Sequence, residues 1–229
     1  MNVIEVKNLV KIYDTGEVQV RAVNGITTNF EQGEFTAVVG PSGSGKTTFL
    51  NMVGGLDRPT EGEVIIDGAN VWELSSRKLI DFRMNNIGFV FQAYNLIPVL
   101  TAGENVEFIM HLQGRPKKER QHRTKELLEA VGLGDRINSR PGKLSGGQQQ
   151  RVAVARALAS KPKFILADEP TANLDSKATT GLLEMMAEMN KKYNTTFIFA
   201  THDQRVMDKA RRIITIEDGK ILSDEKFER

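Results

Sequence analysis

The chain has 229 residues, 40% of them hydrophobic, which is enough for one large domain with a buried core. Its 31 Lys and Arg residues nearly balance its 29 Asp and Glu residues, and the formal net charge of +2 is too small to suggest nucleic acid as a partner. The lack of cysteine excludes disulfides, thiol catalysis and Cys-ligated zinc, and it is compatible with a reducing compartment.

The start of the sequence carries no basic-then-apolar leader, and no apolar run approaches the ~18 residues of a membrane-spanning helix. We therefore expect a soluble, cytoplasmic protein whose role at a membrane would require a partner.

The N-terminal region predicts antiparallel β structure. Residues 3–13 alternate apolar and polar side chains, as in a strand with one wet face, and residues 14–17 predict a turn. Residues 18–30 predict further short strands, after which Gln32-Gly33 leads into a buried strand over 34–39. Tyr13 ends the first strand. It either packs in the core, as such aromatics usually do, or stacks on an adenine face.

A glycine-rich loop follows the β-branched strand and matches G-x-x-x-x-G-K-[ST] at every fixed position. Its glycines let backbone N–H groups crowd around phosphate oxygens, and the helix that begins near Gly45 points its positive end at them. Lys46 would reach the β- and γ-phosphates, and the Thr47 hydroxyl would bind Mg²⁺. The loop therefore predicts a site for a nucleoside triphosphate, built from Gly40, Pro41, Ser42, Gly43, Ser44, Gly45, Lys46, Thr47 and Thr48.

The middle of the chain supplies a further strand end with a polar residue. We predict a strand over 62–68, a helix over 75–84 and an apolar strand over 87–91 that ends at Gln92. Gln92 either is a polar residue that simply ends the strand or acts as a switch that contacts metal and attacking water. The apolar loop 95–100 that follows is either a docking surface or is buried against the next helix.

Two helices are predicted over 101–113 and 117–131. The basic run 115–123 between and within them indicates a solvated helix face, or alternatively proximity to an anionic membrane leaflet. Leu144-Ser-Gly-Gly-Gln148 precedes a helix over 149–159 that Ser145 can cap. Taken alone, this run is a loop and a cap; taken with the phosphate loop, it is a second set of N–H groups directed at phosphate.

Polar residues also end the last two buried strands. Residues 163–169 predict a strand that ends in Asp168 and Glu169, whose side chains should point to opposite sides. Asp168 suits an outer contact to Mg²⁺ and Glu169 suits a general base, whereas the structural alternative is a polar strand end before Pro170. A methionine-striped helix over 176–193 predicts core packing, the strand 196–200 leads to His202, and residues 212–222 predict a hairpin.

Buried strands that alternate with helices define an α/β fold, and ligands of such sheets bind at the carboxyl ends of the strands. With these features the chain resembles the ATP-binding-cassette (ABC) transporter ATPases over nearly its whole length, with the Leu-Ser-Gly-Gly-Gln run close to diagnostic. The segments 54–57, 95–96, 104–106 and 166–171 look most like the lipoprotein-release and macrolide-exporter branch, which is LolD-like and MacB-like. Gly103 departs from the larger apolar residue expected there.

The resemblance implies one ABC ATPase domain over 1–229, with a P-loop NTPase core and antiparallel β region over 1–91 and 161–229 and an inserted α-helical subdomain over about 92–160. It implies ATP and Mg²⁺ as ligands. The catalytic residues it implies are Glu169, His202, Gln92 and Lys46, and the metal ligands are Thr47, Gln92 and Asp168. The ATP-binding residues are Tyr13, Gly40 to Thr48, Ser145, Gly146, Gly147, Gln148 and Asp175.

The resemblance also implies partners. In this family two copies close head to tail around ATP, so we expect a homodimer in the ATP-bound state. We also expect an integral membrane permease that docks near Gln92 to Gln113, at the cytoplasmic face of the inner membrane. An FtsE-like ATPase that regulates cell-wall hydrolysis is the alternative within the family, and an ABC ATPase that acts on nucleic acid or ribosomes is the alternative outside transport.

Overall fold

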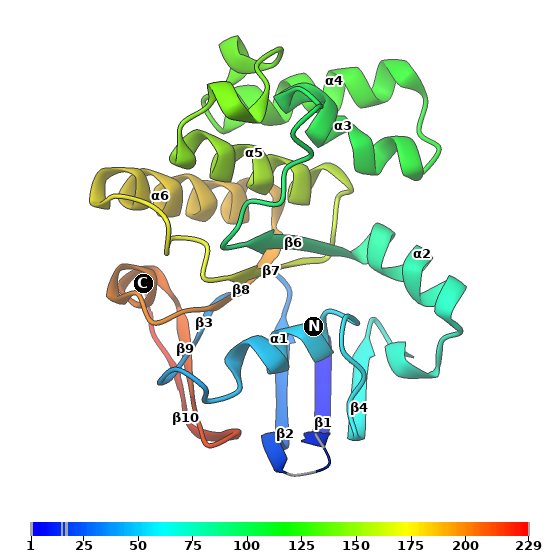
Figure 1. Ribbon diagram of the computed structural model, residues 1–229, viewed down its shortest axis with the longest axis vertical. Coiled ribbons are helices and arrows are strands. Elements are labelled where there is room, and N and C mark those ends of the chain that lie inside the picture. The colour runs from blue at the N-terminus through cyan, green and yellow to red at the C-terminus, as the bar shows by residue number, and fades with distance from the viewer. Residues whose placement is uncertain (1, 15, 17, 229) are drawn as a thin grey trace.

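A mixed β-sheet carries the strand ends that the sequence marks as functional. The computed structural model describes residues 2–14, 16 and 18–228, and within them this sheet has the order β10-β9-β3-β8-β7-β6. The strands from β9 to β6 are mutually parallel, and β10 is antiparallel at one edge. The sheet crosses the middle of the molecule in Figure 1, and its strands are β3 (Phe35–Val39), β6 (Ile87–Phe91), β7 (Phe164–Asp168), β8 (Thr196–Ala200), β9 (Arg212–Glu217) and β10 (Lys220–Lys226).

A second, antiparallel sheet has the order β2-β1-β4-β5 and consists of β1 (Asn2–Asp14), β2 (Gln19–Glu31), β4 (Glu61–Ile66) and β5 (Ala69–Asn70). The prediction of several short strands over 18–30 is wrong, because β2 pairs with β1 along its length. Gly25, with φ of 76°, lies at a register shift in this pairing, so the strand bends through a bulge without ending. Two residues of the predicted turn at 14–17, residues 15 and 17, lie outside the described residues.

Apart from a helix over 204–209 that was not predicted, the helices begin and end close to the expected residues. They are α1 (Lys46–Val53), α2 (Ser76–Asn86), α3 (Ala102–Leu112), α4 (Lys117–Ala130), α5 (Gly146–Ala159), α6 (Ser176–Tyr193) and α7 (Gln204–Lys209). The start of α5 corrects the expectation of a helix from Gln149. Ser145 and Gln148 form a capping box, which places both glycines of the run in the first helical turn.

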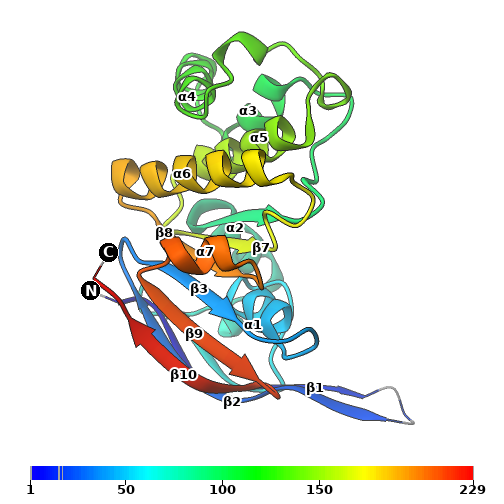
Figure 2. The same ribbon diagram turned by 90° about the vertical axis from the view of Figure 1, so that its left-hand side faces the viewer.

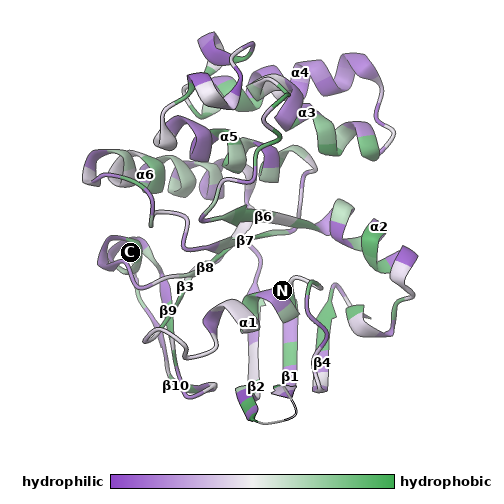
Figure 3. Cartoon of the chain, in the orientation of Figure 1, coloured by the Kyte–Doolittle hydropathy of each residue, from purple (hydrophilic) through white to green (hydrophobic). Residues whose placement is uncertain are grey.

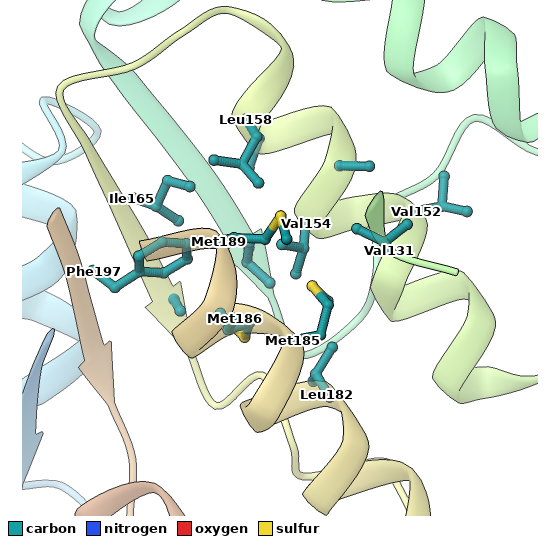
Figure 4. Packing of buried hydrophobic residues seen from close by; sticks show 14 of the residues in the cluster. Val131, Val152, Val154, Leu158, Ile165, Leu182, Met185, Met186, Met189 and Phe197 are labelled. Carbon is teal, nitrogen blue, oxygen red and sulfur yellow. The ribbon is translucent and has the colours of Figure 1, made fainter. Parts of the chain in front are cut away.

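The two faces of the mixed sheet pack into different hydrophobic cores. Successive side chains of a strand point to opposite faces, so neighbouring residues of one strand belong to different cores. In β8, Phe197 and Phe199 pack toward α5 and α6, whereas Ile198 packs on the side of α1 and the antiparallel sheet. Figure 4 shows Met185, Met186 and Met189 of α6 between α5 and the sheet, so the methionine stripe is core packing as predicted. Figure 2 shows α3, α4 and α5 stacked beyond α6, away from the antiparallel sheet.

The basic run on and before α4 is largely neutralised within the protein. Arg115 pairs with Glu119 at 2.8 Å, Arg120 with Glu107 at 2.8 Å and Arg123 with Glu126 at 3.0 Å. The helix is hydrophilic over much of its length in Figure 3. These pairs favour a solvated, internally paired helix face over a lipid-binding patch, because the paired arginines offer less free charge to an anionic leaflet.

The unexpected Gly103 has a packing reason. A Cβ at this position would lie 2.8 Å from Ile137 Cγ1 and 3.1 Å from its carbonyl oxygen. The backbone N–H of Gly103 donates to that oxygen at 2.9 Å, so the start of α3 lies directly against the backbone of Ile137. A larger residue would force the two segments apart.

We therefore expect Gly103→Val to lower the free energy of unfolding by ~1–3 kcal/mol through overpacking. Urea unfolding of the full chain measures this change. Gly142→Ala is the control, since a Cβ there meets nothing within 4 Å, and it should change stability by less than ~0.5 kcal/mol. A Gly103→Val chain as stable as the wild type would show that the Ile137 contact is not constraining.

Candidate active site

The register of the parallel strands brings the predicted polar residues to one edge of the sheet. Ala200 pairs with Val38 and with Asp168, and Asp168 pairs with Phe91, so the ends of these strands lie level. A cavity of about 590 Å³ opens at this edge. It is lined by Ala22, Gly40, Pro41, Ser42, Gly43, Gly45, Lys46, Thr47, Thr48, Gln92, Glu169, Ala172 and His202.

The phosphate loop fits only with glycine at two of its positions. A Cβ on Gly40 would lie 2.0 Å from the carbonyl oxygen of Ile216, and one on Gly45 would lie 2.1 Å from that of Ala22. Both glycines also have positive φ, at 148° and 101°. The loop therefore packs directly on the backbones of β9 and β2, with α1 beginning immediately after it.

The loop has the features of an anion site. The Lys46 ammonium donates to the carbonyl oxygens of Gly40 and Pro41, each at 2.8 Å, so it lies across the mouth of the loop. Within the described residues, the buried Ser44 hydroxyl has no hydrogen-bond partner. An unpaired buried hydroxyl, a lysine and the N-terminus of α1 suit phosphate oxygens, which supply acceptors for all of these donors.

Thr47 and Asp168 contact each other beside the phosphate loop. The Thr47 hydroxyl donates to Asp168 Oδ1 at 3.0 Å. Burial raises the pKa of the Asp168 carboxyl, and the Glu169 carboxylate acts in the same direction, while the Thr47 hydrogen bond and the Lys46 charge oppose the rise. A divalent cation would stabilise the ionised form of such a carboxyl.

The donor set also fits Mg²⁺. Over the residues that the structure describes, no group of three His, Cys, Asp or Glu side chains could hold a metal on its own. Mg²⁺ ordinarily takes one or two protein oxygens and completes its shell with substrate phosphates and water. Thr47, Asp168 and Gln92 would supply such oxygens.

Glu169 does not continue β7, which corrects the prediction of a strand through residue 169. Its φ is 44°, in the left-handed region, and its backbone N–H donates to the carbonyl oxygen of Ala200 at 2.9 Å. This break turns Glu169 away from Asp168 and toward the end of β8. Its Oε1 lies 2.7 Å from His202 Nδ1. The two carboxylates have different neighbours, but the broken strand rather than strand alternation separates them.

Gln92 is exposed and contacts the loop after Glu169. Its side-chain nitrogen lies 3.5 Å from Asn173 Oδ1, and the Asn173 amide donates to the Gln92 carbonyl oxygen at 3.1 Å. The buried Gln150 of α5 joins the same region, donating to the carbonyl oxygens of Pro170 and Phe91 at 2.8 and 3.2 Å. The loops that carry Gln92 and Glu169 are thus attached to α5.

The run from Leu144 to Gln148 lies outside this cavity. Ser145 is exposed, and its hydroxyl accepts from the backbone N–H of Gln148 at 3.3 Å, while Gln148 Oε1 accepts from the Ser145 N–H at 2.9 Å. Neither these residues nor the neighbouring glycines line the cavity. Asp175 caps α6, where it accepts from the Ala178 N–H at 2.8 Å.

Tyr13 also lies outside the lining, at the surface and 39% exposed, so it does not pack in the core. Its hydroxyl donates to Asp57 Oδ2 at 2.5 Å, and Lys11 pairs with the other oxygen of Asp57 at 2.5 Å. Burial raises the pKa of the Tyr13 hydroxyl and the contact with Asp57 raises it further, while the nearby Thr48 side chain opposes the rise. These contacts hold the ring beside the phosphate loop.

Sequence reasoning missed several residues of the site. Ala22 and Ala172 line the cavity without a chemical signal, and Asp57 meets Tyr13 only because the chain folds back over 44 residues. Thr201, adjacent to the predicted His202, donates to Glu169 Oε2 at 3.3 Å. Its position beside a strand end was the one available clue.

Comparison with known proteins identifies the family of the chain. The model of the ABC transporter family matches residues 23–172, more than half of the chain. An uncharacterised ABC transporter ATP-binding protein from Thermotoga maritima is 51% identical over 98% of this chain and 95% of the relative. The macrolide export ATP-binding/permease protein MacB from Hyphomonas neptunium is 48% identical over 96% of this chain, which spans only 34% of that relative.

Among solved structures, the ATP-binding cassette MJ0796 of Methanocaldococcus jannaschii, as a dimer bound to ADP and Pi, matches with a TM-score of 0.90. It is 43% identical, and the match covers 99% of each chain. The chain belongs to the ABC transporter family. It is an ATPase that uses ATP and Mg²⁺, in the branch that includes MacB, and the expected α/β fold of an ABC ATPase is confirmed. Among the described residues, no helix is both long and apolar enough to cross a bilayer.

Proposed function

We propose that this chain powers a membrane transporter by closing head to tail with a second copy around two ATP molecules. The observation that carries this proposal is the position of the α5 N-terminus. It offers an N-cap serine and the first-turn N–H groups of Gly146 and Gly147, which have no acceptor within an α-helix, yet it lies outside the cavity of its own chain. A second copy would bring these donors to the phosphates held by the first, and the dimeric state of MJ0796 supports this arrangement.

Within each half-site we assign roles from the contacts. The phosphate loop and Lys46 bind the phosphates, and Thr47, Asp168 and Gln92 hold Mg²⁺, which would supply positive charge to the phosphate oxygens. Glu169 takes a proton from water as the water oxygen bonds to the γ-phosphorus. The bond from that phosphorus to the bridging oxygen breaks, and ADP and phosphate leave. His202 contacts Glu169 and lines the same cavity.

We expect Glu169→Gln to bind ATP and dimerise but to lose ~10²- to 10⁴-fold in hydrolysis rate, because a general base is removed while the shape is kept. Phosphate release and ATP binding by the purified chain measure the two effects. Glu188→Gln, an exposed carboxylate on α6, is the matched control and should hydrolyse normally. Unimpaired turnover in the Glu169 variant would assign the base to another residue.

A second expected outcome concerns Ser145→Arg, which places bulk and charge at the proposed composite site. It should abolish ATP-dependent dimerisation while the monomer still binds ATP, and light scattering with and without ATP measures this. Ser75→Arg is the control, because Ser75 is an exposed N-cap of α2 outside the site. If the Ser145 variant dimerised normally with ATP, the head-to-tail arrangement would be wrong.

We further propose that a membrane permease docks near Gln92 to Gln113, which places the chain at the cytoplasmic face of the membrane. In the loop 95–100, Leu96 packs against the core, but Val99 is 71% exposed. Phe108 and Leu112 on α3 are 41% and 54% exposed, and Ile80 on α2 is 56% exposed. We call these four residues the apolar surface. The permease part of the MacB relatives, which this chain does not span, supports such a partner.

The ends of the two helices that carry this surface are joined directly. The Gln113 amide, just after α3, donates to the Met84 carbonyl oxygen on α2 at 3.2 Å and to Asn85 Oδ1 at 3.1 Å. Exposed apolar side chains on joined elements favour a protein partner over solvent. The division of the chain into a core and a helical subdomain over about 92–160 belongs to the same proposal, since the docking segment would begin that subdomain.

The double substitution Phe108→Glu and Leu112→Glu should prevent co-purification with the permease expressed from the neighbouring reading frame, because it charges the surface that must be desolvated. ATP-dependent dimerisation of the isolated chain should not change. Leu222→Glu is the control. Leu222 is 68% exposed, but it lies on β10, at the edge of the mixed sheet opposite to β6. Retention of the permease by the double variant would place the docking site elsewhere.

A further inference from the structure

A buried hydroxyl lies behind Glu169, on the side away from solvent. Thr201 directly follows β8 and is fully buried, with its backbone N–H donating to the Val38 carbonyl oxygen at 3.1 Å. Its hydroxyl lies 3.3 Å from Glu169 Oε2. The end of β8 thus contacts Glu169 twice, through the Ala200 carbonyl at the backbone and through Thr201 at the carboxylate.

The surroundings of Thr201 set the direction of this hydrogen bond. The Thr201 oxygen already accepts from the backbone N–H of Asp203 at 3.0 Å. A hydroxyl has one proton, and an ionised carboxylate only accepts, so the proton of Thr201 points at Glu169 Oε2. The orientation of the Thr201 hydroxyl is therefore set by two contacts, with the Asp203 N–H and with Glu169 Oε2.

Asp203 is in turn held firmly. Arg205 donates to both of its carboxylate oxygens, from Nε at 2.9 Å and from Nη2 at 2.7 Å. The buried Thr171, two residues after Glu169, donates to Asp203 Oδ2 at 2.9 Å. The loop after β7 and the loop after β8 are thus fastened together on both sides of the Thr201 contact.

The two oxygens of Glu169 differ in what holds them. Oε1 contacts His202, whose side chain is 75% exposed. Oε2 contacts Thr201, which is fully buried. Oε2 is thus held from the buried side of the carboxylate, whereas Oε1 contacts an exposed side chain.

We propose that Thr201 is a positioning residue for Glu169: its hydroxyl holds Oε2 and leaves Oε1 to take the proton of the attacking water. This inference rests on the proposed role of Glu169 as general base. It assigns to Thr201 an effect on the chemical step rather than on ATP binding, because Thr201 does not line the cavity.

Steady-state ATP hydrolysis by the full-length chain tests the assignment. Thr201→Val keeps the shape and removes the hydroxyl, and it should lower kcat by ~10- to 100-fold with KM for ATP within about twofold. Thr201→Ser keeps the hydroxyl and should restore kcat to within about threefold of the wild type. A role in packing alone would leave kcat of Thr201→Val, which keeps the shape, close to that of the wild type, and it would lower the Tm of Thr201→Ser, which lacks the methyl group.

If the valine chain does not fold, Thr201→Ala removes the same hydroxyl without placing a methyl group against the carboxylate, and the same loss of kcat is expected. In the Glu169→Gln background, Thr201→Val should cause no further loss, since no base remains to be positioned. Full additivity of the two losses would overturn the proposal.

The results separate the two claims. If Glu169→Gln hardly hydrolyses ATP while Thr201→Val has the wild-type kcat, the Thr201 proposal is wrong and the general base stands. If Glu169→Gln hydrolyses ATP normally, both are wrong. A Thr201→Val chain in which only KM rises, or a Thr201→Ser chain as impaired as the valine variant, also contradicts positioning through the hydroxyl.

Discussion

The parallel register of β6, β7, β8 and β3 is the constraint on which the site depends. Parallel pairing sets the ends of these strands level, with Asp168 opposite Ala200 and Phe91 opposite Asp168. Each chemical group then needs only to follow its own strand by one or two residues. A shift of one residue in any pairing would move its polar end out of the cavity and exchange its core faces, so packing of the two cores protects the geometry of the site.

The loops at this edge are held by close backbone approaches and hydrogen bonds rather than by bulky packing. Gly40 lies against the backbone of β9 and Gly45 against that of β2, where a Cβ would collide. Glu169 has a left-handed backbone, whose cost of ~1–3 kcal/mol is borne by its contacts with the end of β8. The phosphate loop and Glu169 are thus both held by contacts within the chain itself.

The arrangement connects the cavity to the segment that we propose as the docking site of the permease. Its ATP cavity is lined by residues of the mixed sheet and its loops, whereas the donors of Ser145 and its glycines are set apart at the start of α5. Gln150 attaches α5 to the loops of Gln92 and Glu169. The segment proposed to meet the permease starts at Gln92 itself, so changes at the phosphates and changes at the docking surface share a short physical connection.

The sequence by itself determined the phosphate loop, the carboxylates, the α/β class and the family, because each depends on local patterns: glycine spacing, apolar runs and the residues that end them. It also indicated the helix cap at Ser145. The tertiary structure decided the rest. The bulge at Gly25 that keeps β2 continuous, the contact of Gly103 with Ile137, the Asp57 contact with Tyr13 and the direction of the Thr201 hydrogen bond all join residues that no local pattern relates. Such contacts depend on the register and approach of whole elements, and only the folded chain sets these.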